Sequence, residues 1–166
     1  EWTYVYIGTN LRLDGIALRG VSQDPKTFAT VAKKLTEITD WPIMLCSLNP
    51  ALLAAAAKAI ADKRPLLYAA TLDNWAEVGE LARKHNLPLV AYAPGSLDNL
   101  SSLVSTLRAM GLEDLVLDPG TMSQKGLGTT VDDFTQLRRS VILDENELLG
   151  YPSMGTPISA CRYRQL

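Results

Sequence analysis

The sequence has few of the residues that build metal clusters and nucleophilic sites. Its 166 residues include two cysteines, Cys46 and Cys161, and one histidine, His85. The cysteines lie far apart and outside any Cys-x-x-Cys pair, which is typical of reduced thiols in a cytosolic protein. Two cysteines are too few for a four-cysteine iron-sulfur cluster or zinc site held by this chain alone. We therefore expect no metal site within the sequence.

The chain also lacks an excess of charge of either sign and a long apolar run. Lys and Arg number 16 and Asp and Glu 18, without blocks of one sign, so we expect no nucleic-acid surface. No apolar run reaches the length of about 18 residues that a membrane span needs. The first residues of the sequence do not resemble a signal peptide. We expect a cytoplasmic protein without membrane contact. The first residue is not methionine, which indicates that the sequence begins inside a longer protein.

Short β-rich apolar runs alternate with segments of helical periodicity. The predicted strands are 15–20, 42–47, 65–70, 88–93 and 114–118, with a weaker one near 149–154 and a possible leading strand at 4–7. The runs lack period-two alternation, as expected for parallel strands covered on both faces. The predicted helices begin at Asp24-Pro25, Asn49-Pro50, Thr71 or Asp73, Ser96, and Asp132 or a neighbouring threonine.

The regular spacing of the strands indicates the fold class. They start about 25 residues apart, the length of a minimal βα unit, which favours a (β/α) barrel of the TIM type over a doubly wound sheet. Eight such units need about 200 residues, so this chain supplies about six. We therefore predict an α/β fold in which residues 1–166 form one incomplete barrel domain.

Ligands bind at the carboxyl ends of the strands in both of these architectures. The candidate binding residues in the loops that follow predicted strands are Asn49, Thr71, Asn74, Asp118 and Thr121. Their hydroxyl, amide and carboxyl groups suit a ligand with hydrogen-bonding edges. The same residue types also cap helices and turns, and Asp118 in particular is suited to cap the Pro119-Gly120 turn, so both interpretations stay open.

No catalytic residue is assigned. His85 falls in the last turn of a predicted helix, at the opposite edge of the sheet from the strand ends. Cys46 has no histidine nearby to activate it, which favours a buried structural thiol. The motifs G-x-G-x-x-G, G-x-x-x-x-G-K-[ST] and H-E-x-x-H are absent, and the glycine-rich segment 120–128 fits a loop between strand and helix better than a phosphate cradle.

Four separated segments resemble the large (gamma) subunit of the corrinoid iron-sulfur protein of the acetyl-CoA decarbonylase/synthase (Wood-Ljungdahl) pathway. The segments are 62–71, 114–120, 133–139 and 150–152, and residues 15–19 and 24–25 fit the same family in the same order. The resemblance covers nearly the whole chain and corresponds to the family's central TIM-barrel domain.

The resemblance implies a protein that carries a methyl group on the cobalt of a corrinoid. The group comes from a methyl-tetrahydropterin, by way of a methyltransferase, and goes to acetyl-CoA synthase. The resemblance also implies a small subunit as partner, and separate domains for a 4Fe-4S cluster and the corrinoid. This sequence has neither the four cysteines of the cluster nor the corrinoid domain. We expect it to bind neither cofactor alone, and to act as scaffold and subunit interface rather than as a catalyst.

Two other functions stay open. One is a pterin-binding barrel methyltransferase, with its ligand at the loops that contain Thr71, Asn74 and Asp118. The other is a purely structural interaction module.

Overall fold

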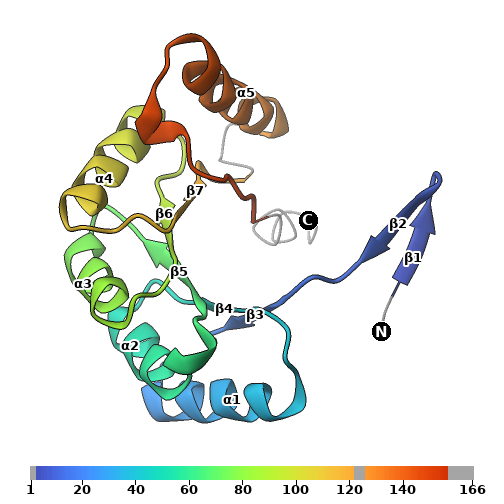
Figure 1. Cartoon of the computed structure of the whole chain (residues 1–166), viewed down its shortest axis with the longest axis vertical. Helices are drawn as coiled ribbons and strands as arrows, with labels where there is room; N and C mark the ends of the chain where they lie inside the picture. The colour runs from blue at the N-terminus through green and yellow to red at the C-terminus, as the bar shows by residue number, and fades with distance from the viewer. Residues whose placement is uncertain (1–2, 122–125, 157–166) are drawn as a thin grey trace.

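A two-stranded hairpin precedes a curved α/β body (Figure 1). The computed structural model describes residues 3–121 and 126–156. In the hairpin, β1 (Thr3–Tyr6) pairs antiparallel with β2 (Thr9–Arg12). The leading strand predicted at 4–7 is confirmed, with a shift of one residue. The sequence did not predict β2, because the turn places Ile7 at φ 47°, a conformation that branched residues rarely adopt.

Five parallel strands form the main sheet. They are β3 (Ile16–Arg19), β4 (Ile43–Cys46), β5 (Leu66–Ala70), β6 (Leu89–Tyr92) and β7 (Leu115–Asp118). All five were predicted. The weaker strand near 149–154 is reduced to one parallel bridge between Leu117 and Ser153. Part of that stretch is a short 3-10 helix, η2 (Glu147–Leu149), and Pro152 has no N–H to donate to a ladder.

A helix follows each strand of the main sheet. The helices are α1 (Pro25–Ile38), α2 (Pro50–Ala59), α3 (Trp75–His85), α4 (Leu97–Ala109) and α5 (Leu127–Leu143), with a 3-10 turn η1 (Ala61–Lys63) after α2. The predicted caps Asp24, Asn49 and Ser96 accept hydrogen bonds from the first-turn N–H groups of α1, α2 and α4. The predicted start of α5 near Asp132 is wrong. The helix begins at Leu127, after a glycine that offers no capping side chain and hence no sequence signal.

The two faces of the sheet differ in their surroundings. Figure 1 shows α1 to α4 along the outer side of the curved sheet. Leu45, Leu67 and Leu117 are fully buried in the core that the sheet shares with the helices. The alternate residues form a face that we call the helix-free face, and several of them, such as Met44 and Tyr68, are half-buried. We predicted that both faces of the sheet are covered. Among the described residues, α1 to α4 cover the outer face only, so the prediction is confirmed for that face alone.

The strand order is β3-β4-β5-β6-β7, so each strand pairs with its neighbours in the sequence. A doubly wound sheet reverses its order at a switch point, and this sheet does not. The α/β class with a parallel sheet is confirmed. Over the described residues the sheet is open, with five strands and one further bridge, and a closed barrel is not observed.

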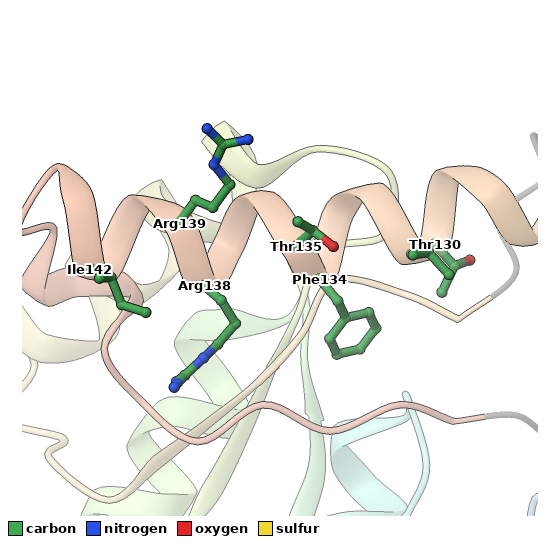
Figure 2. Close-up of a pocket in the computed structure, with 7 residues that line it drawn as sticks. Thr130, Phe134, Thr135, Arg138, Arg139 and Ile142 are labelled. Carbon is green, nitrogen blue, oxygen red and sulfur yellow. The ribbon is translucent and has the colours of Figure 1, made fainter.

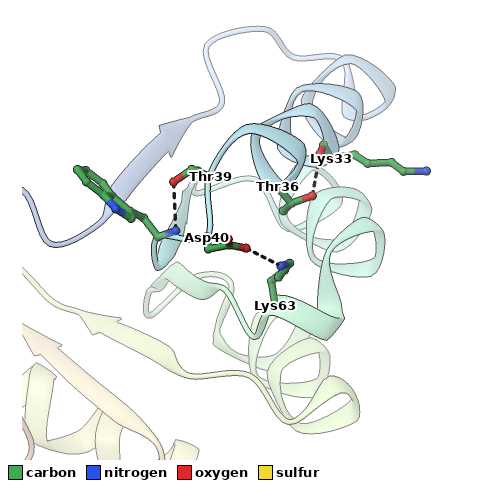
Figure 3. Close-up of polar contacts among 6 residues, drawn as sticks. Lys33, Thr36, Thr39, Asp40 and Lys63 are labelled. Carbon is green, nitrogen blue, oxygen red and sulfur yellow. Dashed lines mark hydrogen bonds and ion pairs between the residues drawn. The ribbon is translucent and has the colours of Figure 1, made fainter. Parts of the chain in front are cut away.

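Polar contacts join the loop between α1 and β4 to η1 at the amino edge of the sheet, away from the strand ends (Figure 3). Lys63 forms an ion pair with Asp40 at 3.3 Å, and Thr39 Oγ1 accepts the Trp41 N–H at 3.1 Å. The Asp40 side chain is almost fully exposed, and exposed ion pairs contribute at most about 1 kcal/mol. These contacts fix a loop and assemble no reactive group.

The end of β7 approaches the loop after β6 so closely that residue 120 must be glycine. Gly120 has φ 89°, and a Cβ atom there would lie 2.6 Å from Pro94 Cβ. Gly95 has φ 78° with open space around it. We expect Gly95→Ala to lower the free energy of unfolding by about 1 kcal/mol, through backbone strain alone. Gly120→Ala should cost about 1 to 3 kcal/mol more, because a clash is added. Equal losses in urea unfolding would contradict the close approach.

Candidate functional site

Asp118, the last residue of β7, joins three segments of the chain. Its carboxylate is fully buried. Oδ1 accepts the Gly120 N–H at 2.8 Å, which confirms the predicted capping of the turn. Oδ2 accepts the hydroxyl of Tyr68 on β5 at 2.9 Å and the hydroxyl of Thr156 at 3.1 Å. One carboxylate therefore holds β5, β7 and the segment after η2 together.

Burial sets the acid-base behaviour of this cluster. It raises the pKa of Asp118 above the ordinary value of 3.8, against the opposing effect of the hydrogen bonds from Gly120, Tyr68 and Thr156. Burial also raises the pKa of Tyr68 and of Tyr92, and the negative charge of Asp118 adds to both shifts. Both phenols stay protonated at neutral pH, and the Tyr68 hydroxyl donates its proton to the hydrogen bond with Asp118.

Residues of all five strands line up at the carboxyl end of the helix-free face. Arg19 is in register with Cys46, Cys46 with Tyr68, and Tyr92 with Asp118. The rings of Tyr68 and Tyr92 lie 5.7 Å apart between centroids, at 43°. We call these five residues the strand-end row. They combine one cation, two aromatic rings and a buried carboxyl group.

The thiol in this row is not an activated nucleophile. Burial raises the pKa of Cys46 to about 11, and the charge of Arg19 only partly offsets this. The thiol is therefore protonated at neutral pH. This agrees with the interpretation of Cys46 as a structural residue, whereas Cys161 lies outside the described residues.

Asn74 braces the loops after β4 and β5. Its Oδ1 accepts the Thr71 N–H at 2.7 Å, and its Nδ2 donates to the carbonyls of Leu48 at 2.9 Å and Ala69 at 3.3 Å. The prediction that a side chain at 71 to 74 caps α3 is wrong, because the Asn74 amide is used between loops and makes no cap bond. Asn49 caps α2 by accepting the Ala51 N–H at 2.9 Å.

The predicted candidates form two groups at the same edge of the sheet. Thr121 Oγ1 accepts the Thr156 N–H at 2.7 Å, which brings Thr121 next to Asp118. Asn49, Thr71 and Asn74 form the other group, at the ends of β4 and β5. Sequence reasoning missed the row's two tyrosines and Thr156. The tyrosines carried a usable signal, since each is a side chain with a polar tip inside an apolar strand.

The described residues do not fit the cofactors that the family resemblance implies. Within residues 3–121 and 126–156, no group of three or more His, Cys, Asp and Glu side chains could hold a metal ion. His85 is the last residue of α3 and comes just before β6, so it lies at the amino edge of the sheet, opposite the carboxyl ends of the strands. Neither a four-cysteine cluster nor a histidine ligand for cobalt can be placed on these residues. None of the described helices has the length and apolar character needed to cross a membrane.

A hollow of about 530 Å³ runs along α5, away from this site. In Figure 2, Phe134, Arg138 and Ile142 lie on one side of α5 and Arg139 on the other. Its walls all come from one helix, and it holds none of the predicted site residues. It is a partly apolar helix face without a covering element among the described residues.

The Asp118 cluster predicts a pH dependence of stability. Because the folded pKa is raised, the folded chain holds the Asp118 proton more tightly than the unfolded chain does. The contribution of Asp118 is therefore full below pH 3.8 and decreases as the pH rises through the raised pKa. We expect the free energy of unfolding of the wild type, minus that of Asp118→Asn, to fall over this range. Urea unfolding at a series of pH values checks this, and a constant difference would contradict it.

Comparison with known proteins gives consistent matches over almost the whole chain. A family model described as CO dehydrogenase/acetyl-CoA synthase delta subunit (CdhD) matches residues 1–166. The acetyl-CoA decarbonylase/synthase complex subunit gamma 2 of Methanosarcina mazei is 48% identical over 161 residues, which is 96% of this chain and 34% of that protein. The corrinoid/iron-sulfur protein large subunit of Moorella thermoacetica is 34% identical over 154 residues, 93% of this chain and 34% of that protein.

A solved structure, that of Mycobacterium tuberculosis Rv1207, matches with a TM-score of 0.59 at 18% identity, over 86% of this chain and 63% of that one. This likeness concerns the fold alone. The chain spans about a third of the length of the curated relatives it matches. The resemblance found in the sequence is confirmed by these relatives, although the family description names a delta subunit and the Methanosarcina relative a gamma subunit. Because the family model matches the chain from end to end, the chain belongs to the CO dehydrogenase/acetyl-CoA synthase delta subunit family.

Proposed function

We propose that this chain is the barrel segment of the large subunit of a corrinoid iron-sulfur protein, where it serves as scaffold and subunit interface. The whole subunit carries a methyl group from a methyl-tetrahydropterin to acetyl-CoA synthase, in the cytoplasm. The corrinoid, bound outside this chain, supplies the cobalt that carries the group, and the 4Fe-4S cluster also lies outside. The partners are the small subunit, the methyltransferase and acetyl-CoA synthase.

One observation favours a scaffold over a ligand site. The side chains of Asn74 and Asp118, at the strand ends, form their hydrogen bonds with other groups of this chain. Both N–H groups of the Asn74 amide go to backbone carbonyls, and the Asp118 carboxylate accepts from one N–H and two hydroxyls. Groups bonded in this way fix the loops in place and leave little capacity for a ligand.

In this proposal the complete fold is a (β/α) barrel, and further βα units outside this chain complete it. The sequential strand order and the helices on one face are those of a barrel wall. On α5, Val131 is 56% exposed and Ile142 66%, beside the hollow of Figure 2 where a following helix would pack. About two or three more units would close such a barrel, and the relatives are long enough to supply them.

A pterin-binding barrel methyltransferase is the second candidate. The observation in its favour is the tyrosine pair of the strand-end row beside Asp118. Two aromatic rings next to a carboxyl group suit a planar ligand with N–H groups at its edge.

Substitution of Asn74 and Asp118 tests the scaffold role. In the full-length subunit, Asn74→Ala and Asp118→Ala each leave buried polar groups unpaired. Each should therefore lower the free energy of unfolding by about 1 to 3 kcal/mol. We expect both variants to assemble less with the small subunit, and methyl transfer to fall in proportion. Asn99→Ala, at an exposed position on α4, is the control. Unchanged assembly and methyl transfer in both variants would overturn the scaffold role.

A thermal-shift titration with methyl-tetrahydrofolate separates the two candidates. A ligand that binds only the folded state raises the melting temperature, and the rise grows with the logarithm of the ligand concentration above Kd. The scaffold role predicts no shift for this chain. A concentration-dependent rise that Asp118→Asn abolishes would favour the pterin-binding alternative instead.

A further inference from the structure

One short link joins the hairpin to the main sheet. Residues 13–15 lie between β2 and β3, outside any regular element, and Figure 1 shows the hairpin apart from the α/β body at the end of this link. The link contains Asp14 followed by Gly15, the single Asp-Gly pair in the sequence. Both residues are exposed, and 74% of the Asp14 side-chain surface is open to solvent. The Asp14 carboxyl group is therefore accessible for a reaction with the neighbouring backbone.

An aspartate side chain can react with the backbone nitrogen of the residue that follows it. A Cβ atom on that following residue hinders the approach, and Gly15 has none. In a folded protein most backbone N–H groups are held in hydrogen bonds. Within residues 3–121 and 126–156, the Gly15 N–H donates to no group, whereas the next one, that of Ile16, donates to the Pro42 carbonyl at 2.9 Å. The Gly15 nitrogen is thus available to the Asp14 carboxyl group.

Two other aspartates show how the fold blocks the same reaction. Asp98 is followed by Asn99 in the first turn of α4, and the Asn99 N–H donates to Ser96 Oγ at 3.2 Å. A nitrogen held in a helical turn and bonded in this way is not free to approach the carboxyl group. Asp118 is followed by Pro119, which has no N–H. Asp98 therefore serves as an internal comparison for Asp14.

We propose that Asp14-Gly15 is a site of spontaneous isoaspartate formation in the link between the hairpin and the main sheet. The Gly15 nitrogen attacks the side-chain carboxyl carbon of Asp14 and forms a C–N bond. The carboxyl hydroxyl leaves as water with the proton of the N–H, and a five-membered succinimide remains. Water then opens this ring. Attack at the side-chain carbonyl restores aspartate, and attack at the main-chain carbonyl of Asp14 leaves isoaspartate.

Isoaspartate changes the geometry of the link. The main chain then runs through the former side chain, which adds one methylene carbon to it, and the free carboxylate is attached directly to Cα. The ion pair between Arg12 Nε and Asp14 Oδ1, now 2.8 Å long, cannot keep this geometry. The hairpin strands pair only with each other, in a sheet separate from the main one. A longer link therefore turns the hairpin without breaking a strand pair of the main sheet.

The test incubates the purified full-length protein for several weeks at neutral pH and physiological temperature. Mass spectrometry with electron-transfer fragmentation distinguishes isoaspartate from aspartate at each site. We expect isoaspartate to accumulate at residue 14 and not at residue 98. Asp14→Glu should lose the signal, because glutamate would have to close a six-membered ring.

The ion pair with Arg12 supplies a second test. It favours the ionised carboxylate, which loses its oxygen less readily than the protonated acid does. Exposed ion pairs are worth at most about 1 kcal/mol, so Arg12→Ala should form isoaspartate about two- to fivefold faster. Arg12→Lys, which keeps the charge, is the matched control and should react at close to the wild-type rate.

The measurements can overturn the inference in two ways. If residue 14 gains no more isoaspartate than residue 98 in the same incubation, the Asp-Gly pair is not reactive in the folded protein. A signal of unchanged size in Asp14→Glu arises elsewhere in the chain and contradicts the assignment as well. No partner or cofactor takes part in these measurements, so their outcome is independent of the proposed function.

Discussion

The buried carboxylate of Asp118 is the interaction on which the strand ends depend. A carboxyl group without water must keep its hydrogen-bond donors, since an unpaired buried charge costs several kcal/mol. Its donors come from β5, from the turn after β7 and from Thr156. None of these segments can move away without loss of a bond to the others. The close approach of Gly120 to Pro94 ties the loop after β6 to the same point. The carboxyl edge of the sheet is thus held as one unit.

The sequence was a good guide to the elements of the fold. All five parallel strands lie where apolar runs predicted them, and the capping residues Asp24, Asn49 and Ser96 mark true helix starts. Local chemistry explains this success, because a cap and an apolar run are both written in adjacent residues. The start of α5 and the strand β2 were missed for the same reason, since neither Gly126 nor the Ile7-Gly8 turn carries the usual signal.

The candidate site was harder to predict, because its members come together only through strand register. Asp118 was found from its place at a strand end, but its partner Tyr68 is 50 residues earlier. Asn74 was predicted to bind a ligand or to cap a helix, and it braces two loops instead. A polar residue after a strand therefore has at least three uses, and only the geometry of the neighbouring loops distinguishes them. In this chain, the residues most suited to a ligand are those that make the edge rigid.

The order of strands has a consequence for how the polypeptide folds during synthesis. Every strand from β3 to β7 pairs with the strands next to it in the sequence, so the contacts within the sheet are of short range along the chain. Each new βα unit can dock on the one before it as it leaves the ribosome, because the strand with which it pairs has already been synthesised. The exception is the outer edge of β3, the first strand of this sheet to be synthesised, which stays unpaired within the described residues. That edge is the part of the nascent sheet most exposed to self-association.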